Sequence, residues 1–378
     1  MEQATATIKE LRWVRRMNPP NFVNSTAISG NGDRVIAGTF YYPYSAAELP
    51  MQFGTFCFDG AGKQLWSDVA EGAEGVYCVA ISPDGAIAAS GGRMEAVDGF
   101  IHAYDVESGK LLANYSTGSR TNQLALSKGR AVLAAGSDQI YLAQSVKGAF
   151  PQNASSYPVN PVANNNVQSV SMPVDGTWFV AGDYAGTVYL VENDSGSIGK
   201  VYTSAAGLLG TVHCVAAAGD GSWFIAVGGS PDVYVFSPES IQQGNYVTKF
   251  SLPTAGRVGW AAISFEGDMI SVVQNNGKAG IVYYLQNQNG TLTQLWSQNT
   301  LSNPNSTSLD ASGEHVTVAD GYTPNGNVGH FYLFDGTSGN LLWSFQTPEM
   351  NWPMFISTLG TGIAAGSDYG DVYYFTPE

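Results

Sequence analysis

Hydrophobic and polar residues alternate in short runs along the whole chain, and glycine-containing pairs interrupt the runs. The clearest unit consists of residues 79–82, a Pro83-Asp84-Gly85 turn, residues 86–91, a loop, residues 100–105 and residues 109–112. Alternation with this short period indicates β-strands, and Asp-Gly, Ser-Gly and Gly-Gly pairs indicate turns. Each unit therefore predicts four short antiparallel strands. No stretch longer than one turn has the periodicity of an amphipathic helix.

The unit recurs eight times along the chain. The glycine of its first turn stands at Gly32, Gly85, Gly129, Gly176, Gly221, Gly267, Gly313 and Gly360, at intervals of 44 to 53 residues. A period in this range, built from short strands, is typical of the blades of a β-propeller. We therefore predict an all-β fold, an eight-bladed β-propeller with four antiparallel strands in each blade.

The eighth repeat reaches Glu378 without a fourth strand, and residues 10–17 match the missing one. They align with the fourth strands of other repeats, which contain Trp66, Trp296 and Trp343 where this segment has Trp13. We expect residues 10–17 to form the outer strand of blade eight and so to close the ring. An N-terminal arm that packs on the surface is the alternative. The prediction is one domain over residues 1–378, with blades one to seven in residues 22–348 and the rest of blade eight in residues 350–378.

Residues 103–112 and 331–343 resemble the PQQ-like repeat, an eight-bladed unit whose tryptophans dock blade to blade. The Pro83-Asp84-Gly85 turn is also similar to the turns of Trp-Asp-repeat propellers. The resemblance implies a propeller scaffold with Trp13, Trp66, Trp296 and Trp343 as docking residues. Because quinone-dependent dehydrogenases, outer-membrane assembly factors and binding proteins share this scaffold, the resemblance does not decide the function.

The composition narrows the possible partners. With 16 basic and 31 acidic residues the net charge is −15, which argues against nucleic acid as a partner. The first residues lack a basic and apolar leader and no run of 18 apolar residues occurs, so we expect no signal peptide and no membrane span. Two localisations stay open, the cytoplasm and export with the signal peptide removed. Cys57, Cys78 and Cys214 have no paired spacing and are expected to be buried thiols. We expect a monomer.

Function is expected on the face that carries the loops between second and third strands and the connections between blades, here called the loop face. The opposite turn face carries the Asp-Gly turns. Loops longer than the minimum usually reflect function. Three such loops and the start of blade eight predict a partner-binding aromatic surface made of Tyr41, Tyr42, Tyr44, Arg93, Tyr322 and Trp352. A self-packed flap that shields the blade edges is the alternative.

Two further sets of polar residues stand near the predicted channel mouth. Carboxylates follow the second strands at Asp138, Asp183, Asp232, Asp320 and Asp368, with Asp98 in a longer loop. They predict a negatively charged rim that either closes turns through backbone hydrogen bonds or binds a cation such as calcium. Equivalent positions before the inner strands carry Asn24, Asn122, Gln168, His213 and Asn305. These side chains either cap backbone groups or bind water or a polar ligand in the channel.

Enzyme motifs are missing from the sequence. A quinone dehydrogenase would need an adjacent cysteine pair, and no Gly-x-Ser-x-Gly motif or phosphate-binding loop is present. We therefore predict a non-enzymatic binding or scaffold propeller, without a cofactor, that engages a protein, peptide or glycan through its loop face. The alternative is a channel-mouth enzyme, a hydrolase, isomerase or quinone-dependent oxidoreductase, that uses the rim carboxylates with a divalent metal such as calcium. The candidate metal ligands are Asp138, Asp183, Asp320 and Asp368.

Overall fold

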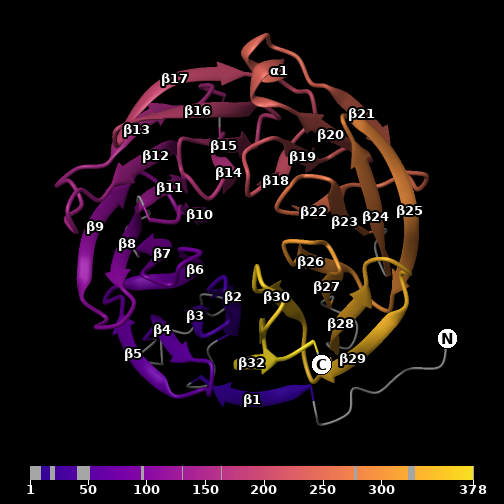
Figure 1. The fold of residues 1–378 in the computed structure, drawn as a ribbon. Coiled ribbons are helices and arrows are strands. Elements are labelled where there is room, and N and C mark those ends of the chain that lie inside the picture. Colours follow the sequence, from indigo (N-terminus) through magenta and orange to yellow (C-terminus); the bar gives the residue numbers. More distant parts are fainter. Residues whose placement is uncertain are drawn as a thin grey trace.

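The strands form a ring of antiparallel sheets around a central axis (Figure 1). The computed structural model describes residues 10–17, 22–40, 52–94, 98–129, 131–162, 164–275, 279–321 and 328–377. Within them the chain forms 32 strands, which make six sheets of four strands and one sheet of eight, and one short helix. This arrangement is that of a β-propeller, so the all-β fold predicted from the repeat is confirmed.

The first strand belongs to the last sheet, and the next eight strands form the eight-stranded sheet. These strands are β1 (Leu11–Arg16), β2 (Phe22–Ile28), β3 (Arg34–Phe40), β4 (Gly54–Asp59), β5 (Gln64–Val69), β6 (Ala73–Ile81), β7 (Ile87–Met94), β8 (Gly99–Asp105) and β9 (Leu111–Thr117). The pairing of Phe40 with Gly75 joins β3 to β6, and so links the group β2–β5 to the group β6–β9.

The following sheets each take four consecutive strands. The first of them consists of β10 (Gln123–Leu126), β11 (Val132–Gly136), β12 (Gln139–Gln144) and β13 (Ser155–Pro158). The second consists of β14 (Val167–Ser171), β15 (Trp178–Asp183), β16 (Val188–Asp194) and β17 (Ser197–Thr203). After them comes the sheet of β18 (Val212–Ala217), β19 (Phe224–Gly228), β20 (Asp232–Phe236) and β21 (Thr248–Ser251). Its last connection holds α1 (Pro238–Gln242), which Ser237 caps. The sequence analysis missed this helix because five residues are too few to show a helical period.

Three more sheets complete the ring. The first consists of β22 (Val258–Ile263), β23 (Met269–Asn275), β24 (Gly280–Gln288) and β25 (Thr291–Thr300). The second consists of β26 (Pro304–Leu309), β27 (His315–Asp320), β28 (Gly329–Asp335) and β29 (Leu341–Thr347). The last consists of β30 (Asn351–Ile356), β31 (Ile363–Ser367), β32 (Asp371–Phe375) and β1.

The N-terminal strand completes the last sheet, as the alignment of residues 10–17 predicts. Strand β1 pairs antiparallel with β32, with Trp13 opposite Tyr374 and Arg16 opposite Asp371. Figure 1 shows β1 and β32 side by side at this seam. Because the pairing covers the edge of β32, it removes a strand edge that would otherwise pair with another molecule.

The repeated glycines close the turns on the turn face. All eight, from Gly32 to Gly360, have φ between +63° and +82°, a left-handed conformation that glycine adopts without steric cost. Backbone hydrogen bonds join one turn to the next, as from Gly30 N to the Pro83 carbonyl (2.9 Å) and from Leu359 N to the Gly30 carbonyl (2.9 Å). The second bond spans the seam, so the turn face is also linked around the closing point.

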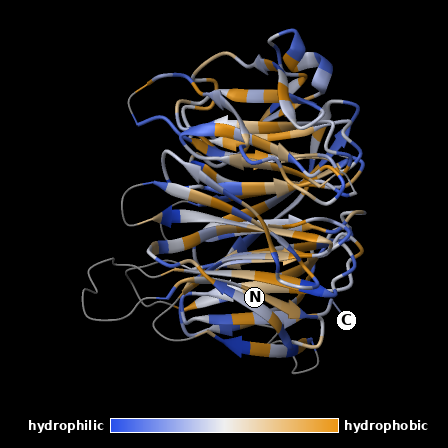
Figure 2. Cartoon of the chain, turned by 90° about the vertical axis from the view of Figure 1, so that its left-hand side faces the viewer, coloured by the Kyte–Doolittle hydropathy of each residue, from blue (hydrophilic) through white to orange (hydrophobic). Residues whose placement is uncertain are grey.

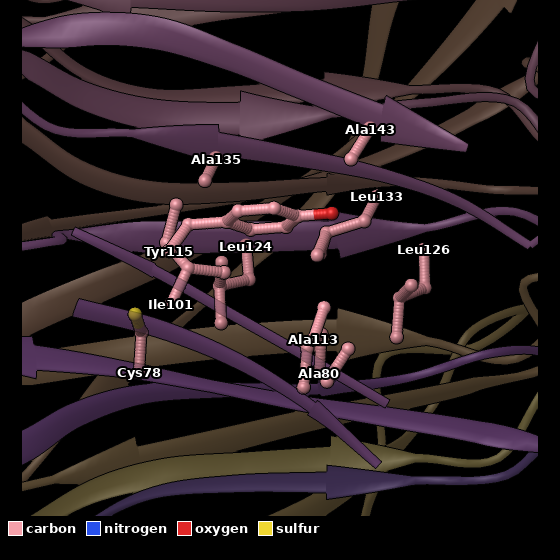
Figure 3. Close-up of a cluster of buried hydrophobic side chains, with 12 residues drawn as sticks. Cys78, Ala80, Ile101, Ala113, Tyr115, Leu124, Leu126, Leu133, Ala135 and Ala143 are labelled. Carbon is pink, nitrogen blue, oxygen red and sulfur yellow. The ribbon is translucent and has the colours of Figure 1, made fainter. Parts of the chain in front are cut away.

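The hydrophobic core lies between neighbouring sheets. One cluster packs Ile101 and Tyr115 of the group β6–β9 against Leu124 and Leu133 of the next sheet (Figure 3). Seen edge-on, the strands carry most of the hydrophobic residues (Figure 2). Alternating strand residues can pack on two neighbours at once because successive side chains point to opposite faces of a sheet. The prediction of buried thiols is confirmed, since Cys57, Cys78 and Cys214 are free and buried.

Tryptophans of the outer strands dock on the next sheet around the ring. Their indole N–H groups donate to backbone carbonyls there: Trp13 to Gly60 (3.1 Å), Trp66 to Val106 (2.7 Å) and Trp296 to Gly336 (2.7 Å). Trp343 instead packs on Phe375, with ring centroids 5.0 Å apart. The four tryptophans that the sequence marks as docking residues therefore connect one sheet to another.

Candidate functional site

A cavity of about 980 Å³ lies in the middle of the ring, at the loop-face end of the inner strands. Its walls are the starts of the innermost strands and the connections that precede them. The five polar residues predicted at the channel mouth all line it: Asn24, Asn122, Gln168, His213 and Asn305. Its volume is at the upper end of the range of small-ligand sites, which also suits a segment of polypeptide.

Register shifts explain why these side chains face the cavity. The innermost strand has a shift between Val23 and Ser25, and corresponding shifts flank Gln168, His213 and Asn305. A β-bulge of this kind adds a residue to one strand and redirects its side chain. In three of these strands the preceding valine, Val23, Val167 or Val212, stays fully buried, while the bulged residue lines the channel.

Part of the polar ring ties the sheets together. The Asn122 amide donates to the Val167 carbonyl (2.8 Å), and the Asn305 amide donates to the Asn351 carbonyl (2.6 Å). His213 Nδ1 lies 2.9 Å from the Val258 carbonyl. Since a carbonyl only accepts, Nδ1 carries the proton, and Nε2 of the neutral ring is an acceptor. These contacts agree with the capping interpretation.

The remaining two polar residues differ from this pattern. Gln168 donates to the side chain of Asn166 in the connection before its own strand. Asn24 has a buried amide oxygen without a hydrogen-bond partner. The ring therefore presents both satisfied and unsatisfied groups to the cavity.

Two arginines line the cavity on the connections that precede β10 and β22. The Arg120 guanidinium lies 4.9 Å from the centre of the Tyr77 ring, and its Nε donates to Asn122 Oδ1 (2.8 Å). Arg257 Nε donates to Asn275 Oδ1 (3.4 Å). These contacts orient both guanidinium groups at the wall of the cavity.

Two carboxylates, Glu349 and Asp368, line the cavity from the last sheet. Asp368 is 8% exposed, and its Oδ1 has no hydrogen-bond partner. Burial, together with the nearby Glu349 charge, raises the pKa of Asp368 to about 7, against a hydrogen bond from Trp352 that lowers it. Burial also raises the pKa of Glu349, against the attraction of Arg16.

The other rim carboxylates have structural partners. Asp183 is fully buried and accepts hydrogen bonds from Thr187 N (2.8 Å) and the Tyr189 hydroxyl (2.7 Å). Asp320, also fully buried, accepts from His330 N (2.7 Å) and the Tyr332 hydroxyl (2.7 Å). These two carboxylates are therefore buried, and the hydrogen bonds that they accept from backbone N–H groups agree with the turn-closing alternative of the prediction.

Two more members of the carboxylate set also have partners. Asp138 accepts from Gly118 N (3.0 Å) and the Tyr141 hydroxyl (3.0 Å), and Asp232 pairs with Lys249 (3.3 Å). Across the part of the chain that the structure describes, no group of three or more His, Cys, Asp or Glu side chains could hold a metal ion.

The predicted aromatic surface falls mostly outside the described residues. Four of its members lie there: Tyr41, Tyr42, Tyr44 and Tyr322. Arg93 forms an ion pair with Glu74 (3.1 Å) and lines a second, smaller pocket of about 280 Å³ together with Arg120. Trp352 is 40% exposed and lines the central cavity.

Several cavity residues were missed by the sequence analysis, namely Phe22, Arg120, Arg257, Trp260 and Glu349. Residues were predicted at the starts of inner strands and at the ends of second strands, and no other individual position was predicted in the connections between sheets that hold Arg120, Arg257 and Glu349. The sequence position could have identified Arg120, Arg257 and Glu349 as cavity residues, since each stands just before an innermost strand. Asn122 was predicted at the channel mouth from the same position.

A ring of antiparallel sheets around a polar central cavity defines the class of protein, a β-propeller. One segment, residues 66–105, matches the WD domain, G-beta repeat. No curated protein is similar enough in sequence to match the chain. None of the described helices is long and apolar enough to cross a membrane.

Solved structures confirm the fold. Sqt1 of Chaetomium thermophilum, bound to the N-terminus of the ribosomal protein L10, is similar with a TM-score of 0.73 at 11% identity, over 98% of this chain and 100% of that one. The β-propeller domain of Cps50 (Swd1) of Myceliophteria thermophila is similar with a TM-score of 0.61 at 15% identity, over 80% of this chain and 96% of that one. At these identities the similarity concerns the fold alone.

Proposed function

We propose that this propeller is a non-enzymatic binding protein that holds a segment of a partner polypeptide in the central cavity and on the loop face around it. The observation that carries the proposal is the cavity of about 980 Å³ with aromatic, amide and charged groups in its wall. Aromatic side chains offer contact area, and amide and charged groups orient a ligand. The similar propeller Sqt1 binds the N-terminus of a ribosomal protein, which supports a polypeptide rather than a glycan as the partner.

A cavity-filling substitution tests the proposal. Gly259 lines the cavity, and a Cβ added there would have its nearest neighbours at 4.0 Å, the carbonyl oxygens of Pro304 and Val273. Gly259→Phe should therefore fold normally and project a ring into the cavity. Leu359→Phe is the matched control, since Leu359 is 69% exposed and lies in a turn on the opposite face.

The measurement is selection from a displayed library of random peptides, followed by affinity measurement with the selected peptides and a glycan array in parallel. We expect peptides that bind the wild type and the Leu359→Phe control equally and bind Gly259→Phe at least tenfold more weakly. Equal binding to all three proteins, or selection of glycans alone, would contradict the proposal.

The aromatic surface predicted from the sequence is a second part of the proposal. Tyrosine side chains combine contact area with a polar tip and often dominate binding energy. Replacing three tyrosines by alanine should weaken binding of the selected peptides by about 2 kcal/mol, roughly 30-fold, at an unchanged melting temperature. The three are Tyr42, Tyr44 and Tyr322. A triple variant that melts early and still binds would identify these loops as a structural flap.

We also propose that the ring counts eight blades, with β2–β5 and β6–β9 as separate blades. The support is the recurrence of eight left-handed turn glycines and the Phe40–Gly75 pairing that joins the two groups. The docking tryptophans agree with the resemblance to PQQ-like repeats. The match over residues 66–105 agrees with the resemblance to Trp-Asp repeats. An experimental structure that resolves eight separate four-stranded sheets around the axis tests this count.

A further inference from the structure

One corner of the cavity combines a buried carboxylate, one oxygen of which has no hydrogen-bond partner, with a partly exposed aromatic ring. Asp368 is 8% exposed, and its Oδ1 has no hydrogen-bond partner although it belongs to a residue of the cavity wall. Most buried carboxylates in this protein accept several hydrogen bonds, as Asp183 does. A buried carboxylate oxygen without a partner is costly, and a ligand that supplies a donor removes this cost.

The positive charges nearby are already engaged with other groups. Arg16 forms two hydrogen bonds with Asp371 (2.5 and 2.9 Å) and lies 3.9 Å from the Tyr369 ring. Arg120 and Arg257, in the cavity wall, contact amide oxygens of their own neighbourhood. Among the ion pairs of the described residues, none includes Asp368 or Glu349. The two carboxylates of the cavity wall therefore take part in no ion pair of the described residues.

Aromatic rings lie beside these carboxylates. Trp352 is 40% exposed and shares the cavity wall with Phe355 and Trp260, whose ring centroids are 6.2 Å apart. The face of an indole or phenyl ring attracts an organic cation through its quadrupole, most strongly where the site is shielded from water. A hard metal cation would instead need six or more oxygen ligands, and this corner offers two carboxylates.

We propose that the corner formed by Glu349, Trp352 and Asp368 is the binding site for a positively charged side chain, arginine or lysine, of the bound polypeptide. The inference rests on the proposed function and names the chemistry of its anchor. The guanidinium or ammonium group donates to the free Oδ1 of Asp368 and lies against Trp352. Arg120 and Arg257, which come from other sheets, then face the neutral or acidic part of the same segment.

The test uses tripeptides of defined charge as probes. Acetyl-Ala-Arg-Ala-amide and its lysine counterpart are titrated into the full-length protein by calorimetry, with the citrulline and norleucine peptides as uncharged controls of matched shape. We expect the charged peptides to bind at least tenfold more tightly than the uncharged ones. A stronger signal with arginine or with lysine identifies the preferred cation.

The protein variants separate charge from fold. Asp368→Asn should abolish the preference for charged peptides, Glu349→Gln should reduce it, and Trp352→Leu should weaken the charged peptides more than the uncharged ones. Asp138→Asn is the matched control, because Asp138 stands at the corresponding strand end of another sheet with its partners satisfied. A melting curve of each variant shows whether the fold is kept.

The inference can fail independently of the proposed function. Absence of binding by the arginine and lysine peptides would refute the proposed cation-binding site. A preference for charged peptides that persists in both Asp368→Asn and Glu349→Gln would also refute it. A different outcome is that library peptides without basic residues still bind the wild type and lose affinity with Gly259→Phe. In that case the cavity remains the peptide-binding site, and only the proposed binding of a basic side chain at this corner is wrong. If Gly259→Phe changes nothing, the proposed function itself fails.

Discussion

The seam between the first and last strands makes a strong prediction about Trp13. This side chain is 7% exposed, stacks on Tyr374 at 5.3 Å and 8°, and donates to the Gly60 carbonyl of the next sheet. Removal of a buried tryptophan costs about 3–5 kcal/mol. The carbonyl left without its donor adds about 1 kcal/mol. We therefore expect Trp13→Ala to destabilise the protein by about 5 kcal/mol.

The corresponding change in melting temperature follows from the size of the chain. At about 2.1 cal/mol/K per residue, unfolding of 378 residues has an entropy of about 0.8 kcal/mol/K. A loss of about 5 kcal/mol then lowers the melting temperature by about 6 °C, measured by calorimetry. Arg12→Ala on the same strand is the control. Its hydrogen bond to Thr376 is exposed, so we expect a change of less than about 1 °C.

A substitution on the opposite side of the contact sharpens the test. Gly62 has φ +80°, and an added Cβ would lie 2.7 Å from the Trp13 ring. Gly62→Ala should cost about 1–2 kcal/mol for the left-handed backbone and about 1–3 kcal/mol for the steric clash. In the Trp13→Ala background the clash disappears and the backbone cost remains. An unchanged melting temperature in Trp13→Ala, or an equal Gly62→Ala penalty in both backgrounds, would refute the docking argument.

Three further predictions concern the seam and the carboxylates. Deletion of residues 1–17 should expose the β32 edge and produce aggregates in size-exclusion chromatography; a monomer with unchanged melting would contradict closure by β1. The folded pKa of Asp368 is raised to about 7 from 3.8, so the folded state binds more protons between these values and stability falls as pH rises through this window. Asp368→Asn should therefore match the wild type at about pH 4 and be more stable at about pH 8, by on the order of 4 kcal/mol, and equal melting temperatures at both values would disprove this. Calcium, magnesium and zinc should leave the melting temperature unchanged, while Asp183→Asn lowers it with or without metal; a rise with calcium that Asp183→Asn and Asp368→Asn abolish would restore the metal site.

Local sequence was sufficient to predict the propeller and its closing strand. The turn glycines must be glycines because their φ angles are positive, and this requirement repeats with every unit. An outer strand such as β25 alternates between exposed and partly buried residues because successive side chains point to opposite faces, whereas a central strand such as β11 is buried throughout because both of its faces pack on neighbouring sheets. The match between residues 10–17 and the other outer strands predicted the seam, since Trp13 makes the same kind of docking contact as Trp66 and Trp296.

Tertiary structure decided which polar groups are satisfied. Asp183 is the last residue of β15 and Asp368 directly follows β31, the second strands of their sheets, and the sequence treats the two alike. In the fold, the Tyr189 hydroxyl of the next strand donates to Asp183, whereas the Tyr373 hydroxyl donates to Asp371 (3.2 Å). Arg16, supplied by a strand from the other end of the chain, also bonds Asp371. The sequence by itself determined the ring and the positions of the carboxylates around it. Only closure of the ring placed Arg16 beside Asp371, because that contact joins residues 355 positions apart, and the Oδ1 atom of Asp368 in the cavity wall stays without a hydrogen-bond partner.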